Sequence, residues 1–233
     1  MDQKTFGSDD SGLLKYKTVE EAREDLEELG LKFEYGCRKE KNPQLQNTEC
    51  YSLGQWYQSF KNDPKLAAEI FKKTCLEMDF KESCMKHAYL STKGYADVKP
   101  DLNMAYESLD HACSKLKDMK SCTAIGLMFI EGILGHGPAP TEALKYFEKA
   151  CSLKSPQGCF HYGGLLYSRA DKFDEKTCTR MKKNAVEAWK KACEYGNPYG
   201  CKNVAKAYLK GDFVSQNQKM ADQYNAMAKK LLD

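Results

Sequence analysis

Eleven cysteines in 233 residues, many of them at a regular interval, constrain the fold of this chain more than any other feature. Aligned on its cysteines, the chain contains five segments that begin 34, 38, 37 and 42 residues apart, at Cys50, Cys84, Cys122, Cys159 and Cys201. A period of this length is the signature of a repeat protein, in which every unit is one small supersecondary element. We therefore expect a row of similar units instead of one globular core.

Each of these segments has the pattern of an α-helix. Mostly apolar residues stand three and seven positions after the cysteine, and four positions after it there is always a small residue: Gly54, Ala88, Gly126, Gly163 or Ala205. Offsets of 0, 3, 4 and 7 lie on one face of a helix. The small residue allows a second helix to approach that face closely.

A second helical pattern precedes four other cysteines. Four residues before them stands a large apolar residue and eight residues before them an alanine, the cysteines being Cys75, Cys113, Cys151 and Cys193. The linkers between the two helices contain turn formers such as Asn62-Asp63-Pro64, and proline cannot continue the first helix. We therefore predict an all-α solenoid of five helix-turn-helix repeats. An N-terminal capping helix over 18–35 precedes them and opens with a capping box, Thr18 and Glu21.

The repeat period also predicts the domain boundaries. We expect a disordered tail over 1–17, because it is polar and has no periodicity. A capping helix and its connection occupy 18–46. Repeats one to five are expected at 47–80, 81–118, 119–155, 156–197 and 198–233.

The cysteines fall into pairs that join the end of one unit to the start of the next. The predicted pairs are 75–84 and 113–122, nine residues apart, 151–159 and 193–201, eight apart, and a looser 37–50, thirteen apart. A short turn between antiparallel helices can bring such positions within the roughly 5.5 Å between Cα atoms that a disulfide needs. The equivalent position in the last helix is Lys229, after which no repeat follows.

A zinc site is the competing interpretation of so many cysteines, but it requires close pairs such as Cys-x-x-Cys, which this sequence lacks. Disulfides in turn imply an oxidising compartment. Cys178 is left over as a free thiol, expected in a loop rich in charge within an insertion at 171–181. Neighbouring cations could lower its pKa and make it reactive, although an unremarkable exposed thiol is the simpler interpretation.

Three stretches resemble Sel-one-like repeats, which are relatives of the tetratricopeptide repeat: 53–57, 143–151 and 185–193. The pairing between successive repeats is similar to that of the bacterial cysteine-rich Hcp proteins and of their eukaryotic counterparts, mitochondrial assembly factors of cytochrome c oxidase. The resemblance covers about residues 33 to 230 and favours the mitochondrial group. It implies residence in the intermembrane space, trapping there by the oxidative import machinery, and complex IV subunits or other assembly factors as partners.

Charge and hydropathy exclude several function classes. The net charge of +3 is too small to indicate nucleic-acid binding, and no apolar stretch is long enough to span a bilayer. Residues 1–34 carry ten acids and five bases, and 174–233 carry twelve bases and seven acids. Such a dipolar chain could orient a partner, although solvated helix faces explain the same pattern. The first 17 residues lack the pattern of a signal peptide or matrix presequence.

Candidate catalytic and cofactor residues are few. His87 occupies an apolar helical position and is expected in the core, His111 lies near a helix end, His136 in a glycine-rich loop, and His161 beside Cys159. The resemblance leaves haem possible without indicating a ligand. A Ser-x-x-Lys match at 114–117, suggested by the reputed β-lactamase link of Hcp proteins, lacks its partner motifs.

Two functions therefore remain. The first is a non-catalytic scaffold whose concave face binds a client through residues off the apolar stripe: Tyr51, Gln55, Gln58, Lys86, Tyr89, Lys202 and Lys206. The second is a thiol–disulfide oxidoreductase or haem-handling protein of the same pathway, or a Hcp-like enzyme. The absence of Cys-x-x-Cys argues against thiol exchange as the main function, and we predict no enzyme.

Overall fold

The computed structural model describes residues 18–95, 97–135 and 137–232, and these residues form eleven α-helices and no strand. The predicted all-α class and the number of helices are confirmed. The predicted disordered tail over 1–17 lies outside the described residues. The helices are α1 (Val19–Lys39), α2 (Pro43–Ser59), α3 (Pro64–Leu76), α4 (Lys81–Lys93), α5 (Leu102–Ser114), α6 (Met119–Glu131), α7 (Pro140–Ser152), α8 (Pro156–Ala170), α9 (Glu175–Glu194), α10 (Pro198–Lys210) and α11 (Gln218–Lys230).

Local sequence signals set where the helices begin. The predicted capping box is present at α1, where Thr18 and Glu21 each accept a hydrogen bond from the other's backbone N–H. Five helices begin with proline at their first position, where its missing N–H has no intrahelical acceptor in any case: α2, α3, α7, α8 and α10. Glycine in the left-handed conformation ends α6 and α10.

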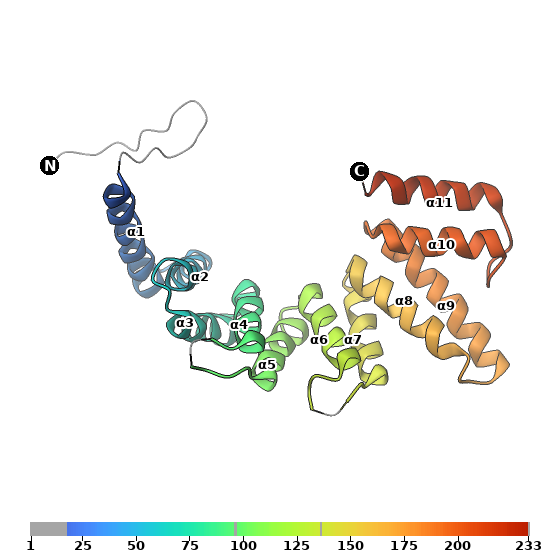
Figure 1. The fold of residues 1–233 in the computed structure, drawn as a ribbon, viewed down its shortest axis with the longest axis horizontal. Coiled ribbons are helices and arrows are strands. Elements are labelled where there is room, and N and C mark those ends of the chain that lie inside the picture. The colour runs from blue at the N-terminus through green and yellow to red at the C-terminus, as the bar shows by residue number, and fades with distance from the viewer. Residues whose placement is uncertain (1–17, 96, 136, 233) are drawn as a thin grey trace.

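The repeats are pairs of helices that pack on each other and on their neighbours along the chain. We call the first helix of each pair an A helix (α2, α4, α6, α8, α10) and the second a B helix (α3, α5, α7, α9, α11). Figure 1 shows the pairs arranged in sequence order along an open arc, with α1 and α11 at its two ends. Both ends of the arc bend toward the same side.

In the three repeats whose A helix has glycine as the small residue, this glycine lies against the large residue of the B helix. A Cβ atom added to Gly54 would lie 2.6 Å from the ring of Phe71, and one added to Gly126 would lie 2.5 Å from the ring of Phe147. Both phenylalanines are at most 1% exposed. This close approach explains why the two sequence patterns recur together, since one provides the space that the other fills.

The insertion of the fourth repeat lengthens helices and does not form the loop that we expected. Asp174 accepts a hydrogen bond from the backbone N–H of Thr177 and caps α9, which is 20 residues long. Cys178 therefore lies in the first turn of a helix. The segment 175–194 contains neither glycine nor proline, so once it is capped nothing interrupts the helix.

Candidate functional site: the cysteine bridges and the groove between α1 and α3

The structure brings ten of the cysteines together as five bonded pairs, and these are the pairs that the spacing predicts. The bonded pairs are 37–50, 75–84, 113–122, 151–159 and 193–201, with Cα atoms between 4.4 and 4.8 Å apart. Each bridge joins the end of one helix pair, or of α1, to the A helix that follows. Neighbouring repeats are thus connected twice, by the main chain and by a disulfide.

The five bridges differ in their exposure. Nine of the ten bonded cysteines are at most 8% exposed. Cys37 is the exception, since it is half-buried in the last turns of α1. The bridge between Cys37 and Cys50 is therefore the one that a reagent in solution can reach without opening the fold.

Cys178 is unpaired in the described part of the chain and half-buried. Its Sγ atom lies 3.5 Å from Oδ1 of Asp171. The Nζ atom of Lys182 donates to the same carboxylate, so this amine is engaged with Asp171.

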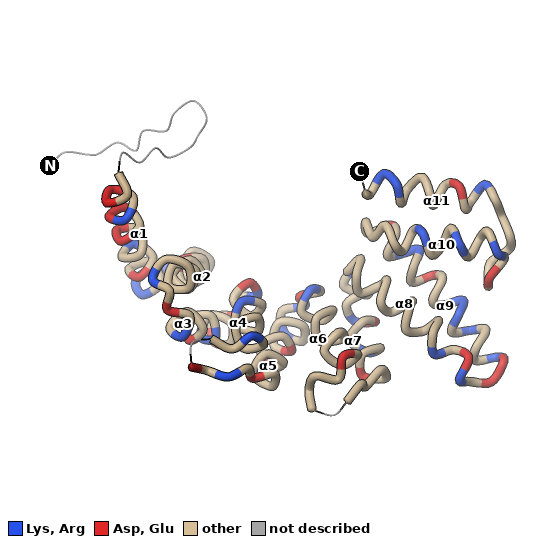
Figure 2. The backbone as a smooth tube through the Cα atoms, viewed as in Figure 1, with Lys and Arg blue, Asp and Glu red and all other residues tan. Residues whose placement is uncertain are grey.

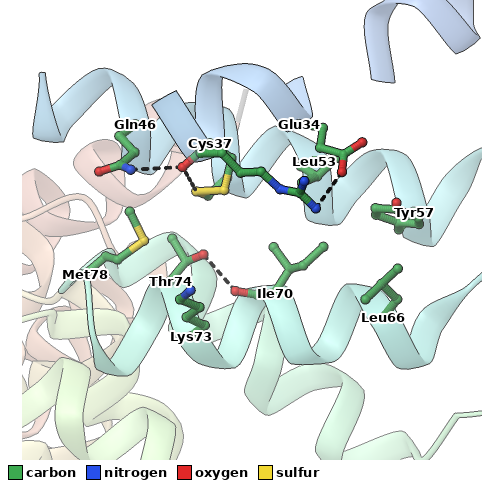
Figure 3. A pocket seen from close by; sticks show the side chains of 12 residues that line it. Glu34, Cys37, Gln46, Leu53, Tyr57, Leu66, Ile70, Lys73, Thr74 and Met78 are labelled. Carbon is green, nitrogen blue, oxygen red and sulfur yellow. Dashed lines mark hydrogen bonds and ion pairs between the residues drawn. A yellow bond between two sulfur atoms is a disulfide. The ribbon is translucent and has the colours of Figure 1, made fainter. Parts of the chain in front are cut away.

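A groove of about 560 Å³ lies beside the exposed bridge. Figure 3 shows α1 along one side and α3 along the other, with α2 behind them. Its lining is contributed by these three helices and the turn after α3: Glu34, Cys37, Arg38, Gln46, Cys50, Leu53, Tyr57, Leu66, Ile70, Lys73, Thr74 and Met78. A concave surface of this volume is within the range of roughly 300–1,000 Å³ that binding sites occupy.

The polar groups that line the groove are mostly engaged with each other. Arg38 forms an ion pair with Glu34 at 2.7 Å, Gln46 donates to the carbonyl of Cys37, and Thr74 donates to the carbonyl of Ile70. Among the charged lining residues this leaves Lys73, which is exposed and has no acidic partner among the described residues. The groove thus combines apolar side chains, internally paired polar groups and one uncompensated positive charge.

The flank of α3 that faces the groove corresponds to the flank by which later B helices contact the preceding repeat. Five residues before its cysteine, α5 has Ser108, whose carbonyl lies 3.9 Å from the sulfur of Cys75. Two residues before its cysteine it has His111, which pairs with Asp79 at 2.8 Å. The equivalent residues of α3 are Ile70 and Lys73, and they face the groove.

Of the predicted client-binding residues of the A helices, Tyr51 packs against Phe71 and Phe80, and the other six are exposed or partly exposed. Gln55, Tyr89, Lys202 and Lys206 are exposed, and Tyr51, Gln58 and Lys86 are half-buried. Tyr89 has the largest exposed aromatic surface among them, at 56%. No side-chain hydrogen bond within the described chain involves Lys86, Lys202 or Lys206, and the amine of Lys202 lies 5.7 Å from the ring centre of Tyr199.

The described histidines are all packed against neighbours. His87 is 2% exposed and its Nδ1 atom lies 2.6 Å from Oγ of Ser108, as expected for a core histidine with a satisfied hydrogen bond. His161 stacks on Phe147 with 5.1 Å between ring centroids, and burial lowers its pKa. His136 lies outside the described residues.

The Ser-x-x-Lys match has no free nucleophile–base pair. The hydroxyl of Ser114 donates to the carboxylate of Asp110 at 3.0 Å. The Nζ atom of Lys117 donates instead to the backbone carbonyl of Ser114 at 2.7 Å. Both groups thus form hydrogen bonds at the C-terminal end of α5.

Metal and cofactor ligands do not cluster in the described residues, where no group of three histidine, cysteine or acidic side chains could hold a metal ion. Haem iron needs an axial histidine, cysteine, methionine or tyrosine. In the groove Met78 and Tyr57 are the side chains of these types that are not bonded to another residue, and no histidine lines it. A haem site thus gains no support from this groove. None of the described helices has the length and apolar character needed to cross a bilayer.

Sequence reasoning did not find the groove. Leu66 and Ile70 are half-buried apolar residues of α3, and their partial exposure depends on how α1 lies against α2. The sequence nonetheless contains a signal for it. In later repeats the equivalent flank packs on the preceding B helix, but the first repeat is preceded only by α1, so this flank of α3 has no B helix to cover it.

Comparison with known proteins agrees with this architecture. The family model of the Sel1 repeat matches residues 81–107, 120–155 and 198–224. The crystal structure of a Sel1 repeat protein from Oxalobacter formigenes superimposes with a TM-score of 0.64, covering 86% of this chain and 83% of that one. At 17% identity this likeness supports the fold alone.

Relatives of similar length extend the likeness over nearly the whole chain. Cytochrome c oxidase assembly factor 7 of Xenopus tropicalis is 29% identical over 224 residues, which cover 95% of this chain and 93% of that protein. The homologue of the same name in Drosophila melanogaster is 27% identical over 252 residues, covering 93% and 91%. Three segments of the chain thus match the Sel1 repeat, and along most of its length the chain is similar to proteins named cytochrome c oxidase assembly factor 7.

Proposed function

We propose that this protein is a non-catalytic scaffold that assists the assembly of cytochrome c oxidase, complex IV of the respiratory chain, in the mitochondrial intermembrane space. The observation that carries this proposal is the similarity, over 95% of the chain, to a protein named as an assembly factor of this enzyme. The solenoid supports it, because stacked helix pairs create an extended surface suited to binding other proteins.

The clients we expect are complex IV subunits or other assembly factors. The open arc presents five A helices in a row, and their exposed side chains combine an aromatic ring at Tyr89 with the amines of Lys202 and Lys206. Aromatic side chains supply much of the energy at protein interfaces, and lysines orient an acidic partner. A long, mixed surface of this kind suits transient binding of a folding subunit.

The five cysteine pairs support the proposed compartment. Cytosolic proteins are kept reduced, whereas bridges persist where the environment is oxidising. We propose that the chain enters the intermembrane space reduced and is oxidised there by the import machinery. Each bridge closes a short loop and stabilises the fold by on the order of 2–3 kcal/mol, so oxidation would retain the folded chain.

A deletion experiment tests the scaffold function. Cells lacking the protein should contain less assembled complex IV on native gels, with unchanged levels of complex II, and the wild-type chain should restore it. Digestion of mitochondria with protease should degrade the protein only after the outer membrane is opened. Normal complex IV in the deleted cells would contradict the function, and protection after outer-membrane rupture would contradict the compartment.

The exposure of Cys37 favours one second candidate, thiol–disulfide exchange with a client. A client thiolate would attack the sulfur of Cys37, form a mixed disulfide with it and release Cys50 as a thiolate. A second client thiol could then displace Cys37, which leaves the client oxidised and the pair reduced. The other four bridges are buried and closed to such an attack.

Partial reduction distinguishes this candidate from the scaffold alone. Mild reductant followed by alkylation and peptide mapping should label Cys37 and Cys50 before any other bonded cysteine. If the buried pairs react at the same rate, the bridge has no special reactivity. If Cys37→Ser with Cys50→Ser restores complex IV as well as the wild type does, exchange has no part in assembly.

A further inference from the structure

The groove between α1 and α3 has a combination of features that neither the repeat architecture nor the bridges explain. Its walls expose Leu66, Ile70 and Met78, which are half-buried, and its one uncompensated charge is Lys73. Apolar side chains left partly in water, next to an unpaired amine, are the features of a surface that a ligand covers.

We propose that this groove binds an acidic, apolar segment of a client protein, with apolar side chains entering the groove and a carboxylate on Lys73. This inference rests on the proposed scaffold function and names a place and a chemistry for the client. It concerns α1–α3, which lie at the end of the arc opposite α10 and α11 (Figure 1).

The later repeats show what chemistry the groove accepts. At the junction of α3 and α5, His111 and Lys115 of the later repeat both pair with Asp79 of the earlier one, at 2.8 Å each. At the next junction, Lys149 donates to Ser114 at 3.2 Å. A basic side chain two residues before the cysteine thus reaches back to the end of the preceding B helix. Lys73 occupies that position in α3, and no described acid meets it.

The shape of the groove favours a polypeptide. From Leu66 to Met78 the wall runs twelve residues along α3 and the turn that follows it, or roughly 18 Å at the helical rise. That length accommodates about five residues of an extended peptide. The ends of the groove are polar, with the side chains of Gln46 and Tyr57 among its lining (Figure 3). Such groups can bind the backbone amides of a peptide, which an acyl chain does not have.

The distribution of charge along α1 further defines the expected ligand. Figure 2 shows that acidic residues gather along the first half of α1, whereas the groove is lined by Glu34, Cys37 and Arg38 from its second half. A client segment with acids at both ends would be repelled from the start of α1. The carboxylate that binds Lys73 is therefore expected on the side of the segment that lies on α3.

The test is an NMR titration of the intact, oxidised protein. The probes are two peptides of about ten residues with the same leucines, one carrying glutamates and the other lysines in their place. The acidic peptide should shift the methyl signals of Leu66, Ile70 and Met78, and the basic peptide should bind at least fivefold more weakly. No binding, or shifts confined to other helices, would overturn the proposal.

Two matched substitutions locate the charge. Lys73→Glu should lower the affinity for the acidic peptide about fivefold, as expected for reversing one exposed ion pair. Lys72→Glu changes the adjacent exposed lysine of the same helix, which does not line the groove, and should change the affinity less than twofold. Equal losses in both variants would mean that only the general charge of α3 matters, which rejects the groove.

A third variant blocks the groove itself. Met78→Trp places a bulky indole ring at the end of the groove and should abolish peptide binding, while the thermal midpoint of the protein stays unchanged. If palmitate displaces the acidic peptide and shifts the signals of the same methyl groups, the groove is an acyl-chain site and the proposal is wrong.

Complementation of cells that lack the protein distinguishes this inference from the scaffold function. Full recovery of complex IV by Lys73→Glu and Met78→Trp rejects the groove alone, whereas failure of the wild-type chain to restore it rejects the scaffold.

Discussion

The Nδ1 atom of His87 in α4 lies 2.6 Å from the Oγ atom of Ser108 in α5, and both side chains are at most 2% exposed. Ser108 in turn lies within 3.3 Å of the carbonyl of Met104, to which its hydroxyl can donate. In that arrangement the Nδ1–H of a neutral imidazole donates to the serine. The pair fixes the packing of α4 on α5 with a polar contact inside an apolar interface.

This contact predicts acid sensitivity. Burial, and to a smaller extent the charge of Lys72, lower the pKa of His87 from its usual 6.5 to about 4. The unfolded chain therefore binds a proton at a pH where the folded one does not. The free energy of unfolding should be constant above about pH 6.5 and fall toward pH 4, by at most about 3 kcal/mol from this residue.

Urea unfolding between pH 4 and 7 measures this effect. His87→Gln can keep a hydrogen bond to Ser108 but cannot titrate, so its stability should vary less over this range. An equal pH dependence in both proteins would show that other groups cause it. One such group is His161, because burial lowers its pKa as well.

Two adjacent glycines of α8 should respond in opposite ways to the same substitution. A Cβ atom on Gly163 would lie 2.7 Å from the ring of Trp189 and 2.8 Å from the carbonyl of Ala185. Gly163→Ala should thus cost about 1–3 kcal/mol, because the backbone oxygen cannot move freely. Gly164 has nothing within 4 Å of such a Cβ atom, and Gly164→Ala should stabilise the helix by about 0.5–1 kcal/mol.

Thermal unfolding of the two variants measures the difference. Because they share a helix and a chemical change, effects on helix propensity cancel between them. Equal midpoints would show that α8 does not approach α9 as closely as described.

The cysteine pairing should be visible by peptide mapping without reductant. Protein isolated under oxidising conditions should yield the linked peptides 37–50, 75–84, 113–122, 151–159 and 193–201, and Cys178 should be alkylated. Reduction should lower the thermal midpoint strongly, since several bridges of about 2–3 kcal/mol each are large beside a net stability of about 5–15 kcal/mol. Free thiols in the two central pairs would refute this arrangement.

Import should depend on the cysteines and not on the first residues. Deleting residues 2–17 should leave the protein in mitochondria, because we expect retention to follow from oxidation of the folded chain. Serine at positions 75, 84, 113 and 122 together should lower its steady-state level there. Fractionation and immunoblotting measure both, and a cytosolic protein after the tail deletion alone would refute retention by oxidation.

Much of this architecture is readable from the sequence because each helix packs only on near neighbours. The match of Gly54 with Phe71, and of Gly126 with Phe147, is repeated in register, so a local pattern also specifies a tertiary contact. The cysteines add a second constraint at every junction. Such a chain encodes its fold with little long-range information.

The features that sequence reasoning missed depend on geometry that does not repeat. Cys178 was expected in a loop, within a stretch rich in charged residues. The cap at Asp174 starts a helix there regardless, since a solvated helix end needs no apolar stripe. The groove arises where α1 takes the place of a B helix without filling it. No other junction provides a template for that arrangement.

The bridges have a consequence for how the chain responds to a protease. Each one closes a turn of eight to thirteen residues around the junction of two repeats. A single cut in such a turn leaves both fragments covalently joined and both helices in place. A cut between the two helices of one repeat has no bridge across it, and only packing then holds the halves together. The protein is thus protected from cleavage at the junctions between its units and vulnerable within each unit.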